Sequence, residues 1–265
     1  MRTYDWNAVD YEQHSQVQQT WARELIEKLA LTGGEDVLDV GCGDGKVTVE
    51  LAKVVSDGTV VGIDNASTMI ELATRRYPNR KFPNLAFRRM DASQLSFDAS
   101  FDVVFSNAAL HWVKDHRPVV AGLYQSLKPD GRILLQMGGK GNAEYILSVL
   151  SEILREAEWR PYFDNFEFPY GFYDTDEYAS LLHAAGFRIQ RLELIPKDMQ
   201  HAGQEGLQGW IRTTWLPYTQ RIPETKRDKF IETLAMRYLE RVPPDSNGQV
   251  HVAMVRVEVE ASRPG

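Results

Sequence analysis

Short apolar runs alternate, over the first half of the chain, with segments whose apolar residues recur at helical spacing. The runs have the length and the β-branched content of buried parallel strands. Five such strands are predicted, at Asp36–Val40, Thr59–Ile63, Leu85–Met90, Phe101–Ser106 and Arg132–Met137. Helices are predicted before and between them, at Gln16–Ala30, Lys46–Ala52, Ser67–Tyr77 and Arg117–Leu127. Strands that alternate with helices of this length indicate a parallel sheet covered on both faces.

The pattern changes after Gly141. Apolar and polar residues alternate in two further predicted strands, at Phe187–Ile195 and Val250–Val259. Most of the remaining residues have helical spacing, and helices are predicted at 142–158, 176–185 and 206–241, the last interrupted by Pro217 and Pro223. We predict a single domain over 1–265, made of an N-terminal helical cap over 1–30, a ligand-binding core over 31–140 and a helical lid over 197–248, which is inserted between the last two strands.

The composition limits the functions open to this chain of 265 residues. Its formal net charge is −7 and no run rich in Lys and Arg stands out, which argues against nucleic acid as a main partner. Its single cysteine, Cys42, excludes an internal disulfide and a cysteine-based zinc cluster, and its histidines show no metal-ligand spacing. No apolar run has the length of a membrane span or a signal peptide. We expect a cytoplasmic monomer without a metal or a membrane partner.

The most informative stretch is DVLDVGCGDG at residues 36–45, in which a predicted strand leads through three alternate glycines to a predicted helix. Residues without Cβ let the backbone approach a bound molecule closely, so this turn predicts a ligand site. Asp39 and Asp44 flank the turn, and their carboxylates would repel a pyrophosphate but not a cationic ligand. The dinucleotide pattern Gly-x-Gly-x-x-Gly also fails, because Lys46 stands in place of its third glycine, and no phosphate-binding P-loop is present.

Polar or small residues follow the next predicted strands, and the carboxyl ends of parallel strands form the edge where open α/β sheets bind ligands. They are Asp64, Asn65, Asp91, Ala92, Ser93, Asn107 and Ala108. Asp64 comes roughly 25 positions after Asp39, about the interval at which an acidic residue meets ribose hydroxyls. A carboxylate at Asp91 is placed to accept from an exocyclic amine. The edge therefore favours a nucleoside with a cationic tail.

These residues closely resemble the class I S-adenosylmethionine-dependent methyltransferases, through LDVGCGDG at 38–45, Asp64, DAS at 91–93 and LKPDGRILL at 127–135. The resemblance implies a Rossmann-like doubly wound α/β fold, a seven-stranded sheet of order 3-2-1-4-5-7-6 with the last strand antiparallel. It implies that S-adenosyl-L-methionine is the cofactor and S-adenosyl-L-homocysteine its product. The implied cofactor-binding residues are Asp39, Gly41, Cys42, Gly43, Gly45, Asp64, Asn65, Asp91, Ala92, Ser93, Asn107 and Ala108.

By the same resemblance, the glycine turn would bind the methionine part, Asp64 the ribose, and Asp91 with Ala92 the adenine, while Asn107 would lie beneath the reacting methyl group. The segment NAALHWVKDH at 107–116 lacks the Asn/Asp-Pro-Pro-aromatic motif of amide and adenine methyltransferases. It is similar instead to carboxylate methyltransferases, those of trans-aconitate, juvenile hormone acid and malonyl carrier protein. Gln18 and Thr20 stand where trans-aconitate enzymes have arginines, which favours a less charged and more apolar acid.

Carboxylate methylation needs no general base, because the acceptor is already ionised at neutral pH. The protein has only to hold the oxygen in line with the methyl group and to exclude water. The amide of Gln18 and the indole N–H of Trp112 are the candidate anchors. We predict an O-methyltransferase for a small carboxylic acid. The alternatives are an N- or O-methyltransferase of an amine or phenol with His111 as base, and a non-catalytic module that binds S-adenosylmethionine.

Overall fold

The structure is a computed structural model that describes the backbone of residues 16–265 and the side chains from Trp21 onward. Seven strands form one sheet in the order β3-β2-β1-β4-β5-β7-β6, as predicted. Strands β1 to β5 pair in parallel, whereas β7 is antiparallel to both β5 and β6. The strands are β1 Asp36–Val40, β2 Thr59–Asp64, β3 Leu85–Arg89, β4 Phe101–Asn107, β5 Leu127–Gly138, β6 Arg188–Ala202 and β7 Gln249–Ser262.

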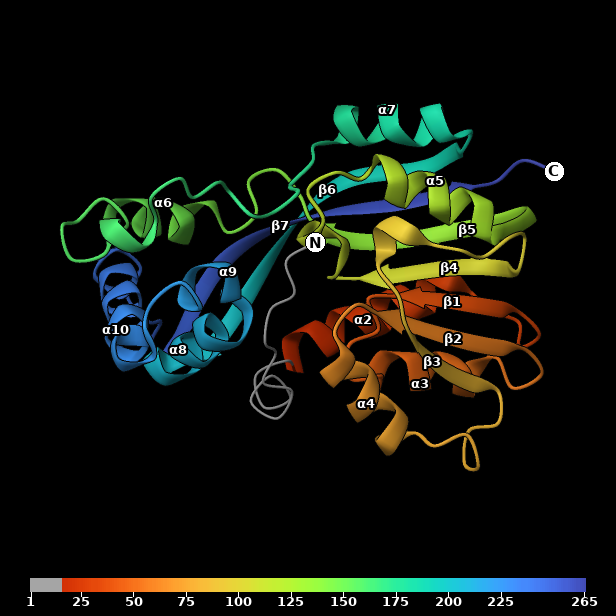
Figure 1. Ribbon diagram of the computed structural model, residues 1–265, viewed down its shortest axis with the longest axis horizontal. Helices are drawn as coiled ribbons and strands as arrows, with labels where there is room; N and C mark the ends of the chain where they lie inside the picture. The colour runs from red at the N-terminus through yellow and green to blue at the C-terminus, as the bar shows by residue number, and fades with distance from the viewer. Residues whose placement is uncertain (1–15) are drawn as a thin grey trace.

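Helices cover both faces of this sheet (Figure 1). Helices α2 (Gln16–Leu29) and α3 (Lys46–Val54) pack on one face, and α4 (Ser67–Arg76) lies along β2 and β3. Helices α5 (Arg117–Ser126) and α7 (Thr175–Ala185) pack on the other face. Successive residues of β1 show why both faces need cover, because Val37 and Leu38 are completely buried in opposite cores.

Beyond the sheet, β6 and β7 continue as a two-stranded ribbon. Strand β7 pairs with β5 only as far as Arg256, whereas its residues 249–255 pair with residues 196–202 of β6 alone. Four helices gather on this ribbon, α6 (Glu144–Ile153), α8 (Gly203–Thr214), α9 (Leu216–Thr219) and α10 (Glu224–Arg241) (Figure 1). We call the ribbon and these helices the helical unit.

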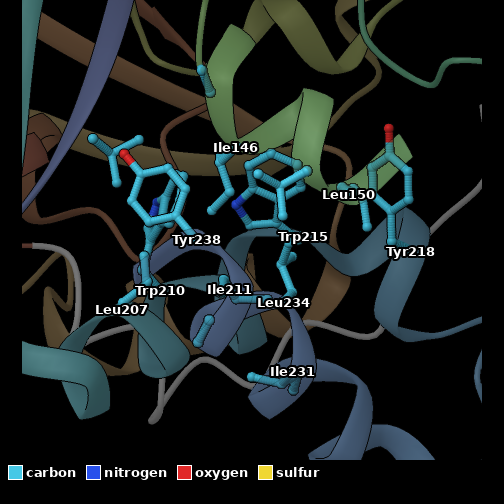
Figure 2. Packing of buried hydrophobic residues seen from close by; sticks show 14 of the residues in the cluster. Ile146, Leu150, Leu207, Trp210, Ile211, Trp215, Tyr218, Ile231, Leu234 and Tyr238 are labelled. Carbon is cyan, nitrogen blue, oxygen red and sulfur yellow. The ribbon is translucent and has the colours of Figure 1, made fainter. Parts of the chain in front are cut away.

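The helical unit has a hydrophobic core of its own, rich in aromatic side chains (Figure 2). Ile146 and Leu150 of α6 pack there against Trp210 of α8 and Leu234 of α10. Trp21 of α2 belongs to the same core, so the N-terminal helix contacts both the sheet and the helical unit. Short 3-10 helices complete the chain, η1 Ala92–Gln94, η2 Leu110–Trp112 and η3 Arg160–Tyr162.

The helix predicted over 142–158 is shorter, at Glu144–Ile153, and two predicted boundaries in the sheet also differ from the structure. Residues 197–202, expected at the start of a helical lid, form the end of β6, because they pair with β7 through Ala202 opposite Gln249. Pro196 is tolerated there, since β6 is an edge strand and its nitrogen need not donate to a neighbour. Strand β5 begins at Leu127 instead of Arg132, because Leu127 pairs with Phe101 ahead of a register shift.

Ion pairs fix α2 on the sheet. Lys28 Nζ lies 2.5 Å from the carboxylate of Glu258 on β7, and Lys197 on β6 pairs with Glu24 at the same distance. Glu258 is buried, and the Nε2 of Gln136 also donates to it at 2.7 Å. These contacts set the place at which the N-terminal helix crosses β7, beside the cavity described below.

Candidate functional site

The glycine turn after β1 is held against β2 and opens on one side. The amide groups of Gly41 and Cys42 both donate to the carbonyl of Ile63, at 2.8 and 2.9 Å. Gly41, Gly43 and Gly45 all have positive φ, of 80°, 53° and 81°, which L-residues rarely adopt. A Cβ on Gly45 would lie 2.7 Å from the ring of Phe87, whereas a Cβ on Gly43 would meet nothing within 4 Å. Gly43 therefore leaves room for a ligand against the backbone.

The two acidic residues of the turn carry less net charge than their sequence suggests. Asp39 is buried and accepts a hydrogen bond from Thr48 Oγ1 at 2.7 Å, and its burial raises the pKa of Asp39 to about 7. Asp44 pairs with Arg76 at 2.9 Å and with Lys46 at 3.5 Å. The expected repulsion of a pyrophosphate is therefore weaker than the sequence argument assumed.

Cys42, between the two acids, is buried, and its burial raises the pKa of the Cys42 thiol. Because the thiol stays protonated, Cys42 is a small residue of the turn and a poor nucleophile.

Asp64, at the tip of β2, is connected directly to the glycine turn. One carboxylate oxygen accepts from the amide of Gly43 at 3.1 Å, and the other accepts from the amide of Ala66 at 2.9 Å. Burial raises the pKa of Asp64, although these backbone hydrogen bonds oppose the shift. The neighbouring Asn65 accepts from the guanidinium of Arg89 through its backbone carbonyl. Asp64, which is predicted to bind the ribose, and the turn that is predicted to bind the methionine part thus form one connected surface.

Asp91 and Ser93, at the end of β3, hold each other in place. Asp91 caps η1, where its Oδ1 accepts from the amide of Ser93 at 2.8 Å and from its hydroxyl at 2.7 Å. Ala92 begins this 3-10 turn. The register of the parallel strands brings Asp39, Asp64 and Asp91 to one edge of the sheet, as predicted.

Asn107 and Ala108 end β4 at the same edge. Asn107 pairs in register with Gln136, and the amide of Ala108 donates to the carbonyl of Gln136 at 2.7 Å. Ala108 has a φ of 56°, an unfavourable value for an L-residue, which turns the chain sharply toward η2. That turn places His111 and Trp112 beside the end of the strand.

A cavity of about 70 Å³, which we call the inner cavity, lies at this point. It begins at Ala108 and extends under η2 toward α8 and β7. Most of its wall is aromatic or thioether, namely Trp112, Tyr170, Phe172, Met199, Trp210, Trp215 and Met254. Its polar lining consists of His111, Asn142, Thr214 and Arg256. The inner cavity therefore joins the cofactor edge to the helical unit.

His111 is enclosed by aromatic rings and is neutral at physiological pH. Its ring lies within 6.0 Å, between centroids, of Trp112, Tyr170 and Phe172. Burial first, then the charges of Arg256 and His116, lower the pKa of His111 well below its usual range. The amide of Gly138 donates to His111 Nδ1 at 3.4 Å, which assigns the ring hydrogen to Nε2. His111 is thus a hydrogen-bond donor and a weak base.

Trp112 lies between the inner cavity and a second one of about 780 Å³, the outer cavity. Its ring packs edge-on against Tyr170, with centroids 5.2 Å apart. The outer cavity is lined by residues that include Ser93, Lys114, Phe166, Phe168 and Arg221. The structure thus brings Trp112 and His111 together as the sequence suggested. Gln18 lies in α2, but its side chain is outside the described residues.

Arg256 is a site residue that the sequence analysis missed. It lies on β7, is 3% exposed and lines the inner cavity, with its guanidinium 5.1 Å from the ring centroid of Trp21. The sequence does contain a signal. Arg256 falls in phase with Val252 and Met254, the buried positions of an alternating strand, where a charged residue requires an explanation.

Within residues 21–265, no cluster of three or more His, Cys, Asp or Glu side chains is arranged to hold a metal ion. No helix in the described part of the chain has both the length and the apolar character needed to cross a membrane.

Known proteins resemble this chain over most of its length. The methyltransferase-domain family matches residues 38–135. Trans-aconitate 2-methyltransferase of Deinococcus radiodurans is 30% identical over 265 residues, covering 98% of each chain. An uncharacterised methyltransferase of Schizosaccharomyces pombe is 34% identical over 197 residues, covering 72% of this chain and 74% of that protein.

Solved structures share the fold at low identity. YcgJ from Bacillus subtilis has a TM-score of 0.61 at 19% identity, covering 93% of this chain and 99% of its own. The Haemonchus contortus phosphoethanolamine N-methyltransferase 2, in complex with S-adenosyl-L-methionine, has a TM-score of 0.62 at 18% identity, covering 97% of this chain and 57% of its own.

The residues at the carboxyl edge fit such a cofactor. Gly43 leaves open space against the backbone, and the Asp64 carboxylate stands beside it at the tip of β2. Carboxylates at this edge suit the hydroxyls of a ribose and the positive charge of a sulfonium. With relatives that match its whole length, the chain belongs to the class I S-adenosylmethionine-dependent methyltransferases, and S-adenosylmethionine is its cofactor.

Proposed function

We propose that the protein methylates the carboxylate oxygen of a small organic acid bound in the inner cavity. The observation that carries this proposal is the state of His111, the residue that the sequence analysis offered as the general base for an amine or phenol. A general base works best when its pKa lies near the working pH, and the surroundings of His111 lower its pKa far below that range. His111 is therefore a poor general base for an amine or phenol acceptor, which must lose a proton.

The same surroundings suit a carboxylate acceptor, which needs hydrogen-bond donors. The chemistry supplied by bound S-adenosylmethionine is an activated methyl group on a sulfonium. An ionised carboxylate has no proton to lose when its oxygen takes that group, so the protein needs donors and not a base. His111 Nε2–H and the guanidinium of Arg256 are donors in the wall of the inner cavity, and Trp112 carries an indole N–H.

The cofactor side of the proposed site uses the predicted residues. The glycine turn would hold the methionine part, Asp64 and Asn65 the ribose, and Asp91, Ala92 and Ser93 the adenine. Asn107 and Ala108 would lie between the cofactor and the inner cavity, because they join β4 to η2. The helical unit would act as a lid that excludes water from the acceptor, which favours transfer to the acid.

The relatives support this proposal, because several are named trans-aconitate 2-methyltransferase, a name that places the methyl group on an organic acid. The test is to incubate the protein and S-adenosylmethionine with matched panels of aliphatic and aromatic acids, amines and phenols. Mass spectrometry before and after mild alkali distinguishes methyl esters, which hydrolyse, from methylamines and aryl ethers, which do not. We expect ester products only. Alkali-stable products alone would exclude carboxyl methylation, and tight cofactor binding without any product would indicate a binding module.

A further inference from the structure

We propose that Arg256 binds the acceptor's carboxylate and selects acids that carry one carboxylate on a small, flat, apolar body, as the cavity volume of about 70 Å³ requires. This inference rests on the proposed carboxyl methylation and adds the anchor and the substrate class. It starts from the position of Arg256, a nearly buried cation in the wall of the inner cavity.

The charge of Arg256 acts inside the cavity. It helps to lower the pKa of His111, which lines the same space, so the guanidinium and the imidazole share one electrostatic environment. The backbone of Arg256 is fixed, because it pairs with Gly138 on one side and with Ile195 on the other. Trp21 packs over its face at 5.1 Å. A stacked guanidinium keeps the donors at its edge, which suits two parallel hydrogen bonds to a carboxylate.

The cavity wall limits the number of carboxylates. Among the lining residues that the structure describes, Arg256 is the only cation and none is an acid. Asn142 and Thr214 are the neutral polar groups, and the remaining surface is aromatic, thioether or alanine. A second carboxylate would face this apolar surface without a compensating charge, which is unfavourable. The wall therefore fits one anionic head and an apolar body.

The body of the acid is expected to contact the rings around His111. Tyr170 and Phe172 stack with centroids 5.2 Å apart and an interplanar angle of 5°, which gives the cavity a flat aromatic side. Trp210 of α8 and Trp215, the residue that follows α8, also line the cavity. Their rings meet edge to face with centroids 5.3 Å apart. Flat walls of this kind favour planar, apolar groups over branched polar ones.

Binding measurements test the inference by removing the negative charge from the ligand or the positive charge from residue 256. Calorimetry in the presence of S-adenosylhomocysteine would compare propionate and crotonate with their amides, and crotonate with fumarate, in which a second carboxylate replaces the methyl group. We expect the wild-type protein to prefer each acid to its amide by about 10- to 100-fold, as for a charged hydrogen bond. Fumarate should bind at least about 10-fold more weakly than crotonate, because its second carboxylate meets no further cation among the described lining residues.

Variants separate the anchor from the fold. Arg256→Met should bring the ratio of acid to amide affinity close to one, and Arg256→Lys should leave an intermediate ratio because the charge remains. Arg263→Met is the matched control, since the Arg263 guanidinium also lies over an aromatic ring, that of Tyr124 at 5.0 Å, and does not line the inner cavity. It should keep the wild-type ratio. Affinity for S-adenosylhomocysteine reports whether each variant is folded, and Arg256→Lys decides the question if Arg256→Met fails that check.

The outcomes distinguish the two proposals. An unchanged acid-to-amide ratio in the folded Arg256 variants, or equal binding of acids and amides by the wild-type protein, overturns the role of Arg256. Tighter binding of fumarate than of crotonate overturns the selection of monocarboxylates. Either result leaves carboxyl methylation standing if methyl esters still form, whereas alkali-stable products alone would remove carboxyl methylation itself.

Discussion

Gly41 and Ala109 face each other so closely that a methyl group on Gly41 would lie 2.0 Å from the Cβ of Ala109. The two residues follow β1 and β4, which are adjacent parallel strands. Their contact joins the glycine turn to the segment that carries His111 and Trp112. The glycine at position 41 is therefore required by packing as well as by its positive φ.

Gly41→Ala should lower the free energy of unfolding by about 2–4 kcal/mol, through overpacking and the left-handed backbone. Gly43→Ala is the matched control, because it has a positive φ but open space, and should cost only about 1 kcal/mol. The double variant Gly41→Ala with Ala109→Gly should recover most of the difference. Urea unfolding measures all three, and a double variant no more stable than Gly41→Ala alone would show that another contact is responsible.

His111 should not appear in the pH dependence of activity. Because its pKa is lowered by burial and by Arg256, we expect kcat/KM for an acid acceptor to stay level from pH 6 to 8. His111→Gln, which can still donate a hydrogen bond, should keep the same profile, whereas His111→Phe should raise the KM of the acid about 10-fold. An acid limb near pH 6.5 that disappears in His111→Gln would instead identify His111 as a base.

Asp39 should make the protein less stable as the pH rises. Its pKa is about 7 when folded and near 4 when unfolded, so the native state holds a proton that the unfolded chain has already lost between these values. The free energy of unfolding should therefore fall over this window by up to about 4 kcal/mol relative to Asp39→Asn. Thr48→Val, which removes a donor to the carboxylate, should extend the window above pH 7. Parallel pH profiles for wild type and Asp39→Asn would contradict the raised pKa.

Asp64 should matter for the cofactor and not only for the turn. Asp64→Asn keeps the size and one acceptor oxygen, but loses charged hydrogen bonds to ribose hydroxyls, so affinity for S-adenosylhomocysteine should fall about 10- to 100-fold. Asp102→Asn is the control, because Asp102 binds Lys128 and the amide of Asp36 at the opposite ends of the strands. Calorimetry compares the two variants, and equal losses would argue against a ribose contact at Asp64.

Trp112 should control the length of the acceptor, because it lines both cavities. Trp112→Ala would join them, and we expect the preference among straight-chain acids to shift by several carbons toward longer chains. Trp112→Phe keeps an aromatic ring between the cavities but loses the pyrrole ring with its indole N–H. It should keep the chain-length preference and raise the KM of all acids about equally. Competition assays with a homologous series of acids distinguish the two effects, and an unchanged series in Trp112→Ala would exclude a separating role.

The parallel core of the fold could be predicted from the sequence, because buried strands there are short, continuous and bounded by turns. The ends of β1 and β2 agree with the structure to within one residue. The end of β6 was missed, because Pro196, Lys197 and Asp198 interrupt its pattern. Its last residues are strand only because β7, some 50 residues later, pairs with them. Pairing between distant segments leaves little trace in a local pattern.

The candidate site, too, could be predicted only in part from the sequence. The residues at the strand ends were named correctly as neighbours, since a parallel sheet brings such ends together. The state of His111 was not predictable, because Tyr170 and Phe172 enclose it from a segment some 60 residues later. The pairing of Asp44 with Arg76 was equally hidden. Arg256 was visible as a charge in the inward phase of a strand, where Glu258 is the other buried charged residue.

The ribbon of β6 and β7 separates two parts of the enzyme whose sequences can evolve at different rates. The residues proposed to hold the methyl donor lie before position 109, whereas Asn142, Thr214, Trp215 and the other far walls of the inner cavity belong to segments after position 139. Substitutions in α8 or the outer ribbon can reshape the acceptor chamber while the donor-binding edge is left intact. A combinatorial library confined to these positions would thus be a practical way to retarget the enzyme to new acids.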